Sequence, residues 1–282
     1  MPTVRVEPIA ALDDPRLEDY RDVKDATRRR NRGVFVAESR LVVRTLVTAG
    51  RFRVRSLLLT AAALAALRAD LEAATLDAPL YVAAKTMIDG VVGFRFHRGC
   101  LAVAERGPGT PFARVIADLG TGPACVVVCE RLTNPDNIGG VFRNAAAFGA
   151  GAVLLAPGCS DPLYRKAIRV SMGGTLRTPF ATVPAWPADL NRLRAAGFTV
   201  IALTPDPRAV DIATLGRPRR VALLVGPEDE GLGAAARAAA DVAVRIPMAP
   251  GVDSLNAATA CGIALHRLSP AVPARDDADG TC

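Results

Sequence analysis

Residues 124–158 read ACVVVCERLTNPDNIGGVFRNAAAFGAGAVLLAPG, and this stretch decides the fold. Its outer segments, ACVVVCE and GAVLLAP, are uninterrupted apolar runs of the kind that form parallel strands covered on both faces. Between them, Asn137 can cap a helix that begins near Ile138, and Gly149 can end that helix. A strand, a helix and a second strand in this order predict a parallel α/β unit.

Two later segments repeat this apolar character: TVIALTP at 199–205 and VALLVGP at 221–227. Helical stretches separate the apolar runs from one another. We therefore expect residues 121–269 to form one α/β domain around a parallel sheet.

The amino-terminal part of the chain predicts a second, smaller α/β domain over residues 20–104, because strand-like and helical stretches alternate there. Ser39 is a suitable N-cap, and Gly50 a suitable stop, for a helix between them. Three other segments complete the expected organisation: an extension at 1–19, a Gly- and Pro-rich linker at 105–120 and a disordered tail at 270–282.

The composition excludes several classes of protein. Of the 282 residues, 50% are hydrophobic and 22% are charged, which is typical of a folded globular protein rather than a disordered or fibrous one. No apolar stretch approaches the roughly 18 residues that a membrane helix needs. Residues 1–15 lack the basic and then apolar pattern of a secretory signal, so we expect a cytoplasmic protein that does not contact membranes.

The cysteines indicate a reduced protein without a metal site. There are six cysteines and two histidines, with no CxxC pair among them, which favours neither a zinc site nor a disulfide framework. Cys125 and Cys129 would point to the same face of one strand, where we interpret them as small core residues.

The charge balance allows a polyanionic partner. Lys and Arg together number 35 against 28 Asp and Glu, which gives a net charge of +7. Most of these cations are arginines, whose planar guanidinium groups pair well with phosphates. The alternative explanation of the high arginine content is a GC-rich genome, which raises the Arg and Ala contents of its proteins together.

The loops that follow the strands are where ligands of open parallel sheets bind. Arg143 stands less than two turns into the helix of the first loop, so its guanidinium either extends to solvent or is held at a site. Glu228 directly follows Gly226 and Pro227, where a carboxylate could accept hydrogen bonds. The loops have neither the GxGxxG of a dinucleotide site nor the Lys and Ser/Thr of a phosphate loop, so we expect that the protein binds neither a dinucleotide nor ATP.

A third loop lies within IPMAPGVDSLNAATACGIAL at 246–265. Ser254 is a natural cap for the helix that follows, and Asn256 would then lie just inside the first turn, where Asn is a poor helix former. Small residues after Asn256 would let another helix approach closely, and a dimer interface is one explanation for them.

Three segments together, NPDNIGGVFRNAAAFGA, LLVGPEDEGL and IPMAPGVDSLNAATACGIAL, resemble the three motifs of the SpoU/TrmH branch of the SPOUT RNA methyltransferases. Their order and spacing fit this branch as well, and the resemblance covers about residues 121–268. RGVFVAESRLVVRTLVTAG at 32–50 is similar to the L30e-like substrate-binding domain that precedes this module in many members. The resemblance implies a parallel sheet with a deep trefoil knot, a fold that periodicity alone would not suggest.

The resemblance also implies functional residues. Methyl transfer would depend on Arg143, with Asn137, Glu228, Ser254 and Asn256 as the other catalytic-site positions. The cofactor would be S-adenosylmethionine, bound by Leu203, Gly226, Ile246, Met248 and Leu255. Pro227 departs from the family, which commonly has Asn, Ser, Thr or Ala there, and it removes one backbone donor from the cofactor loop.

The implied reaction is methylation of a ribose 2′-hydroxyl of RNA, with no metal required. Arg143 would hold the neighbouring phosphate and the developing oxygen anion, since a guanidinium stays protonated well above neutral pH and is a poor base. Ser254 and Asn256 would position Arg143 and the cofactor, and Glu228 would fix its loop.

RNA is the expected partner, with ribosomal RNA favoured over transfer RNA because of the amino-terminal domain. The basic run Arg28, Arg29, Arg30 and Arg32 would contact its phosphates, unless these residues only form a solvated charged face. The family also implies a homodimer. Three alternatives stay open: a tRNA 2′-O-methyltransferase, a base methyltransferase of another SPOUT branch, and a non-catalytic RNA-binding scaffold of the same fold.

Overall fold

The computed structural model describes residues 5–21, 23 and 25–270. They pack into two compact units. The first unit takes the residues up to 110 together with 132–143 and 159–179, and the second takes 111–131, 144–158 and the residues from 180 onward. The expected domain boundaries therefore stay a prediction, and the expected tail lies, apart from Pro270, outside the described residues.

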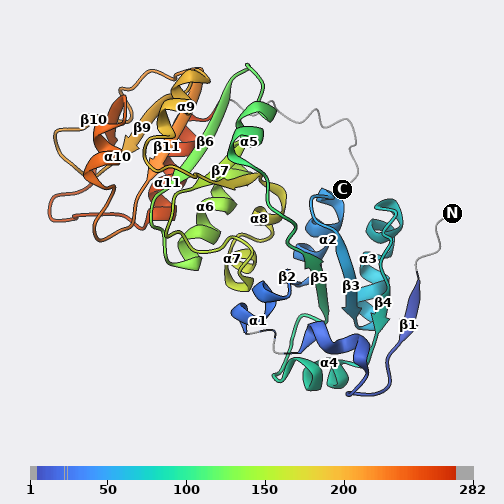
Figure 1. Cartoon of the computed structure of the whole chain (residues 1–282). Helices are drawn as coiled ribbons and strands as arrows, with labels where there is room; N and C mark the ends of the chain where they lie inside the picture. Colours follow the sequence, from blue (N-terminus) through green and yellow to red (C-terminus); the bar gives the residue numbers. More distant parts are fainter. Residues whose placement is uncertain (1–4, 22, 24, 271–282) are drawn as a thin grey trace, which may run out of the picture. The chain divides into compact units, whose positions relative to one another are not determined.

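The second unit is built on a parallel sheet (Figure 1). The four apolar runs form four of its strands, and every residue of β6 and β11 is buried. All neighbouring strands pair in parallel, which confirms the expected α/β fold with a parallel sheet; the knot stays a prediction. In sheet order the strands are β10 (Val210–Asp211), β12 (Val242–Arg245), β9 (Thr199–Leu203), β11 (Arg220–Val225), β6 (Ala124–Cys129), β7 (Ala152–Leu155) and β8 (Phe180–Thr182).

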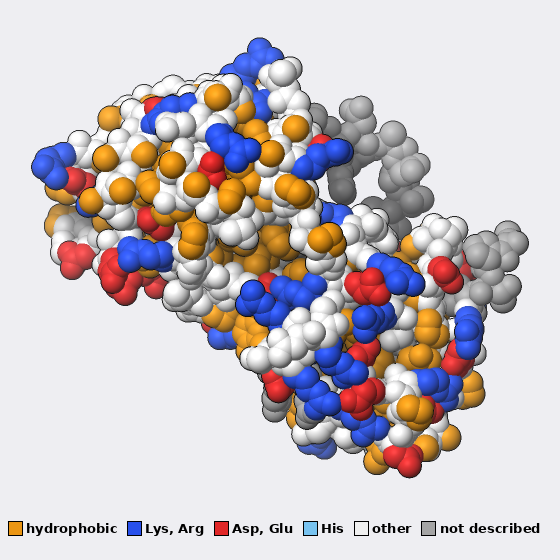
Figure 2. Space-filling view, in the orientation of Figure 1, with side chains coloured by type: hydrophobic (Ala, Val, Ile, Leu, Met, Phe, Trp, Pro, Cys, Tyr) orange, Lys and Arg blue, Asp and Glu red, His pale blue; other side chains and the backbone are white. Residues whose placement is uncertain are grey.

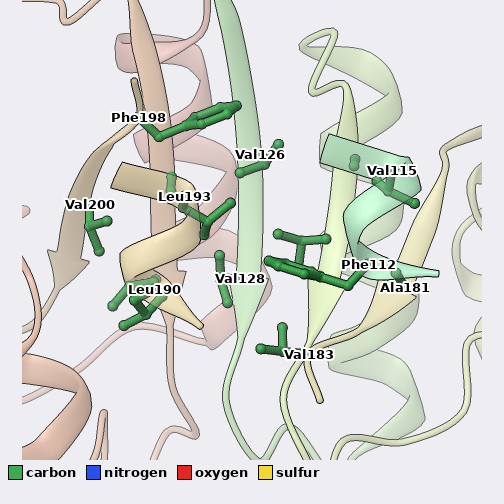
Figure 3. Packing of buried hydrophobic residues seen from close by; sticks show 14 of the residues in the cluster. Phe112, Val115, Val126, Val128, Ala181, Val183, Leu190, Leu193, Phe198 and Val200 are labelled. Carbon is green, nitrogen blue, oxygen red and sulfur yellow. The ribbon is translucent and has the colours of Figure 1, made fainter. Parts of the chain in front are cut away.

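Helices cover both faces of this sheet because its strands are apolar on both sides. Figure 3 shows Phe112 of α5 and Leu193 of α9 beside β6, with Val126 and Val128 in the same buried cluster. On the opposite face, α11 packs on β11, and its buried Cys261 lies near Cys125 of β6. The helices of this unit are α5 (Phe112–Asp118), the last turn of α6 (Pro135–Ala147), α9 (Leu190–Ala195), α10 (Ala234–Ala238) and α11 (Ala257–Leu268).

The first unit contains a mixed five-stranded sheet. Its strand order is β1 (Val6–Pro8), β4 (Leu80–Val82), β3 (Val54–Leu59), β5 (Cys100–Glu105) and β2 (Val34–Glu38). β5 pairs antiparallel with both β2 and β3, whereas β4 pairs in parallel with β1 and β3. The segment expected to be an extension thus contributes β1 to the sheet, a strand too short to show a periodic pattern in the sequence.

Helices of two different parts of the chain complete the first unit. Those before the linker are the 3-10 helix η1 (Pro15–Tyr20), α1 (Ala26–Asn31), α2 (Arg40–Ala49), α3 (Ala61–Ala73) and α4 (Lys85–Val92). The first turns of α6, α7 (Arg165–Val170) and α8 (Gly174–Arg177) come from later in the chain. The expected limits of α2 are confirmed, because the Ser39 hydroxyl accepts from the Val42 N–H and Gly50 has a φ of +62°.

The expected start of α6 is wrong. The helix begins at Pro135, and the side chain of Asn134 accepts a hydrogen bond of 2.9 Å from the Asp136 N–H. Proline is favoured at the first helical position, where its missing N–H has no intrahelical partner. Asn137 therefore lies inside the first turn and is 8% exposed, whereas Gly149, with a φ of +70°, ends the helix as expected.

Within the described part of the chain, no helix has the length and apolar character needed to cross a membrane.

Candidate functional site

The second unit contains a cavity of about 400 Å³ where β9, β11 and β12 end. This lies within the usual range for pockets that bind small molecules. The cavity sits beyond the carboxyl ends of parallel strands, the expected place for a ligand site in such a sheet. Its lining consists of residues 203–206, 225–232 and 253–255 together with Arg237, Ile246, Met248, Ala257 and Ala260.

The loop after β11 turns back tightly on itself. A Cβ atom at Gly226 would lie 2.6 Å from the carbonyl carbon of Gly231 and from the Leu232 nitrogen. Gly231 has a φ of +64°, a conformation that suits glycine, and its N–H donates to the Pro227 carbonyl at 3.0 Å. Two glycines and a proline therefore fix the shape of this wall of the cavity.

Glu228 connects this loop to the start of α11. Its Oε1 accepts a hydrogen bond of 3.0 Å from the Ala257 N–H and another from the Nδ2 of Asn256. A carboxylate at a helix amino terminus also interacts favourably with the helix dipole. Two walls of the cavity, far apart in the sequence, are thereby joined through one side chain, and we name this contact the Glu228 clasp.

The structure corrects the roles expected for Ser254 and Asn256. Asn256 is the N-cap of α11, and its Oδ1 accepts from the N–H groups of Ala258 and Thr259, each at 3.1 Å. The prediction that Ser254 caps the helix and that Asn256 lies inside it is therefore wrong. Asn suits this position because its oxygen caps the helix while its nitrogen donates to Glu228. Ser254 lies on the cavity wall instead.

The first turns of α6, with Asn137, belong to the first unit. A Cβ atom at Gly139 would lie 2.7 Å from the Cβ of Val170 in α7, so α6 approaches α7 closely. Phe142 faces the protein interior and is fully buried, whereas Arg143 is exposed at the next position of the helix. The placement of Arg143 and Asn137 beside the cavity stays a prediction.

The last turn of α6 packs on α11 within the second unit. The Nδ2 of Asn144 donates to the Ala258 carbonyl at 2.6 Å, and a Cβ at Gly262 would lie 2.9 Å from that nitrogen. Part of the small-residue face of α11 is thus covered within this chain. Ile263 of the same helix is 42% exposed, and the dimer interface stays a prediction.

The charges around the cavity are mostly negative. Five carboxylates line it, those of Asp206, Glu228, Asp229, Glu230 and Asp253, and Arg237 is the cation among the described lining residues. Hydrogen bonds from the exposed Arg208 side chain lower the pKa of Asp206 to about 2, so it is ionised at neutral pH. This lining favours a ligand with a cationic centre over a phosphate.

The lining also has an apolar part. Leu203, Ile246 and Leu255 stand on the cavity wall, and such side chains suit a flat aromatic group. The residues present therefore fit a small ligand that combines a cation with an aromatic ring.

Most positions predicted from the sequence meet at this cavity. The five expected cofactor positions all line it, together with Glu228 and Ser254. Sequence reasoning missed Asp206 and Arg237, although Asp206 could have been suspected because it follows the strand-ending TVIAL segment. No group of three or more His, Cys, Asp or Glu side chains that could hold a metal occurs among the described residues.

Most arginines of the expected RNA-binding run are paired with carboxylates or buried within the first unit. Arg28 pairs with Glu18 at 2.8 Å, and Arg32 lies 3.3 Å from Asp19. Arg29 is buried, at 6% exposure. Arg30 is exposed on α1. RNA binding by this run stays a prediction.

Comparisons with known proteins find relatives that share this sequence and fold. The model of the SpoU rRNA Methylase family matches residues 124–266. An uncharacterized tRNA/rRNA methyltransferase of Mycobacterium tuberculosis is 42% identical over 269 residues, which are 93% of this chain and 91% of that protein. The 23S rRNA (guanosine-2′-O-)-methyltransferase RlmB of Ralstonia nicotianae is 32% identical over 189 residues, 66% of this chain and 76% of RlmB.

A solved structure extends the similarity to both units. The AdoMet-bound rRNA methyltransferase from Sinorhizobium meliloti matches with a TM-score of 0.77 and 26% identity, covering 93% of this chain and 97% of that one.

Proposed function

Because the chain belongs to the SpoU rRNA methylase family and is an RNA methyltransferase, we propose that it methylates a ribose 2′-hydroxyl of ribosomal RNA. The observation that carries the proposal is the cavity at the ends of β9, β11 and β12, which lies inside the family match. The name of the Ralstonia relative, which specifies a guanosine 2′-O position in 23S rRNA, supports the ribose and the ribosomal target.

The methyl donor is S-adenosylmethionine, the AdoMet of the Sinorhizobium structure. Its sulfonium and ammonium groups suit the carboxylates of Asp206, Glu228 and Asp253, and its adenine suits the apolar wall. When bound, it supplies a methyl group on a positively charged sulfur atom, which an oxygen nucleophile can attack. The tight turn at Gly226, where a Cβ atom would lie 2.6 Å from backbone, shapes the wall that follows β11.

The chain's own residues orient the nucleophile and stabilise its charge. The exposed guanidinium of Arg143 holds the phosphate next to the target ribose and stabilises the negative charge that develops on the 2′-oxygen. The proton of the hydroxyl passes to that phosphate or to water, because a guanidinium group is a poor base. Glu228 and Asn256 keep the walls of the donor site in register through the Glu228 clasp.

The working enzyme is a cytoplasmic homodimer in this proposal. The exposed Ile263 of α11 provides part of the surface for a second copy. Sedimentation velocity should show a dimer at micromolar concentration, and a monomer over the whole concentration range would contradict this part of the proposal.

Analysis of the methylated product tests the reaction. The protein is incubated with labelled S-adenosylmethionine and RNA from a strain that lacks the gene, and the RNA is digested to nucleosides. A 2′-O-methylated nucleoside from ribosomal RNA is the expected product. A methyl group on a base would identify a base methyltransferase, and label in transfer RNA alone would identify a tRNA enzyme.

Arg143→Ala tests the role of the arginine. Methyl transfer should be lost while the affinity for S-adenosylmethionine stays within several-fold of the wild-type value. The matched control is Arg114→Ala, which removes an exposed arginine paired with Asp118 on α5. Equal loss of donor binding and transfer in Arg143→Ala would make this arginine a structural residue.

Thermal unfolding tests donor binding against the alternative of a non-catalytic RNA-binding scaffold of the same fold. A ligand at 100 times its dissociation constant stabilises the folded protein by about 2.7 kcal/mol. S-adenosylmethionine should therefore raise the melting temperature, and its failure to do so would favour the scaffold.

A further inference from the structure

The cavity at the ends of β9, β11 and β12 contains two opposite charges that the protein itself does not use. Four of its five carboxylates already accept hydrogen bonds or pair with an arginine, and these are Asp206, Glu228, Asp229 and Glu230. The side chains of the fifth, Asp253, and of the lining cation, Arg237, form no hydrogen bond or ion pair among the described residues. Both groups therefore remain available to a ligand.

Arg237 stands on α10, the short helix that follows the tight loop after β11. The preceding residue, Ala236, is buried at 1% exposure, whereas Arg237 is exposed and lines the cavity. Arg208 donates to both oxygens of Asp206, at 3.1 and 2.8 Å, and the charge of Arg237 adds to its effect in lowering the pKa of that carboxyl. Arg237 is thus close enough to act on the cavity while its guanidinium stays unpaired among the described residues.

Asp253 stands on another wall of the same cavity. It is an exposed residue of the loop between β12 and α11, directly before Ser254 and Leu255, which also line the cavity. Figure 2 shows Asp and Glu side chains gathered on the loops below α10, with a Lys or Arg side chain beside them. An available cation and an available anion from two separate segments therefore border one space of about 400 Å³.

The methyl donor carries the complementary pair of charges. The methionine part of S-adenosylmethionine ends in an ammonium and a carboxylate on one carbon atom, and both are charged at neutral pH. In this cavity the carboxylate would meet five others, which is unfavourable unless a cation accompanies it. Arg237 is the described lining side chain that can do so, since guanidinium groups bind carboxylates through two parallel hydrogen bonds.

We propose that Arg237 binds the carboxylate of the methyl donor while Asp253 binds its ammonium, so that this pair makes the enzyme select a donor with an intact amino-acid end. The inference deepens the proposed function and rests on it for the identity of the donor, and it does not depend on which RNA or which position is methylated. The product, S-adenosylhomocysteine, keeps both charged groups, so its binding should depend on Arg237 in the same way.

Two substitutions test the two charges separately. Arg237→Gln removes the cation, and Asp253→Asn removes the anion with little change in shape. The matched control is Arg114→Gln, which removes an arginine of the same unit that pairs with Asp118 at 2.7 Å and does not line the cavity. The three substituted residues are all exposed, so the substitutions leave the buried core of the protein intact.

Isothermal titration measures the affinity of each variant for S-adenosylmethionine and for its decarboxylated form, which keeps the sulfonium and ammonium groups. Arg237→Gln should weaken the binding of S-adenosylmethionine about ten-fold, as expected for the loss of one charge-assisted pair. The same variant should not weaken the decarboxylated form, which has no carboxylate to lose. Asp253→Asn should weaken both ligands alike, because both keep the ammonium, and Arg114→Gln should match the wild type with each.

Several results would overturn the proposal. Equal weakening of both ligands by Arg237→Gln would show that this arginine affects the cavity as a whole and does not recognise the carboxylate. Wild-type affinity of Arg237→Gln for S-adenosylmethionine would show that the carboxylate binds elsewhere. Wild-type affinity of Asp253→Asn for both ligands would remove the ammonium contact.

The affinity for a fluorescent single-stranded RNA, measured over a series of salt concentrations, excludes a different role for the arginine. Arg237→Gln should keep the wild-type slope of log affinity against log salt. A slope reduced by about 0.7 with unchanged donor affinity would make Arg237 a phosphate contact and overturn the proposal. The titrations with donor contain no RNA, so a wild-type protein that binds the donor but forms no 2′-O-methyl product would refute the proposed function alone.

Discussion

Replacement of Glu228 by glutamine should loosen the donor site by a calculable amount. In the wild type, one carboxylate oxygen accepts from both Ala257 and Asn256. Hydrogen bonds to a charged group contribute about 1.5–3 kcal/mol, against about 0.5–1.5 kcal/mol for neutral pairs. The interaction of the charge with the helix dipole adds roughly 0.3–1 kcal/mol.

Solvent reduces these figures because Glu228 is an exposed residue. Screening at such positions leaves roughly 1 kcal/mol for an interaction between charges. We therefore expect Glu228→Gln to lower the free energy of unfolding by about 1 kcal/mol. If the clasp sets the distance between the two walls, the affinity for S-adenosylmethionine should fall by a similar free energy, about five-fold.

Isothermal titration with S-adenosylmethionine and urea unfolding measure the two quantities. The matched control is Glu230→Gln, which removes a charge from the same loop. The Glu230 carboxylate pairs with Arg131 at 2.7 Å and makes no hydrogen bond to α11. If Glu228→Gln and Glu230→Gln weaken donor binding equally, the total charge of the cavity matters and the clasp does not.

Three further changes have defined outcomes. Gly226→Ala should abolish donor binding, because its Cβ would collide with backbone at 2.6 Å, whereas Gly216→Ala, with no atom within 4 Å, should bind normally in the same calorimetric assay. Burial raises the pKa of Cys125 to about 11, so its thiol should resist iodoacetamide at pH 8 until urea unfolds the protein, and peptide mapping that finds it alkylated in the folded state would contradict this. Arg208→Ala should return the pKa of Asp206 from about 2 toward its usual 3.8, which a carboxyl NMR titration measures. Since the native pKa is the lower one, the contribution of Asp206 to folding stability is present above pH 4 and is lost as the pH falls toward 2. An unchanged titration would show that a group other than Arg208 lowers the pKa of this carboxylate.

The sequence determined the parallel sheet and the place of the cavity. The four apolar runs that the sequence predicts to be strands are strands in the structure. A strand buried on both faces needs apolar side chains at every position, and this pattern is visible in a short stretch of sequence. The cofactor positions were implied by the resemblance of the three loops to a known family, and they line one cavity because the carboxyl ends of parallel strands meet at one edge of a sheet. The mixed sheet of the first unit was less visible, since β1 has only three residues and its pairing with β4 spans most of that unit.

The tertiary structure alone decided which polar residue does what. Ser254 and Asn256 are both suitable helix N-caps by residue type. In the structure Asn256 is the N-cap, and its amide nitrogen donates to Glu228, which lies 28 positions earlier in the sequence. Arg29 lies in a run of similar arginines, yet it is the one that is buried beside Arg165. Local sequence encodes periodicity and capping potential, whereas the partner of a polar group depends on contacts between distant segments, which form only when the chain has folded.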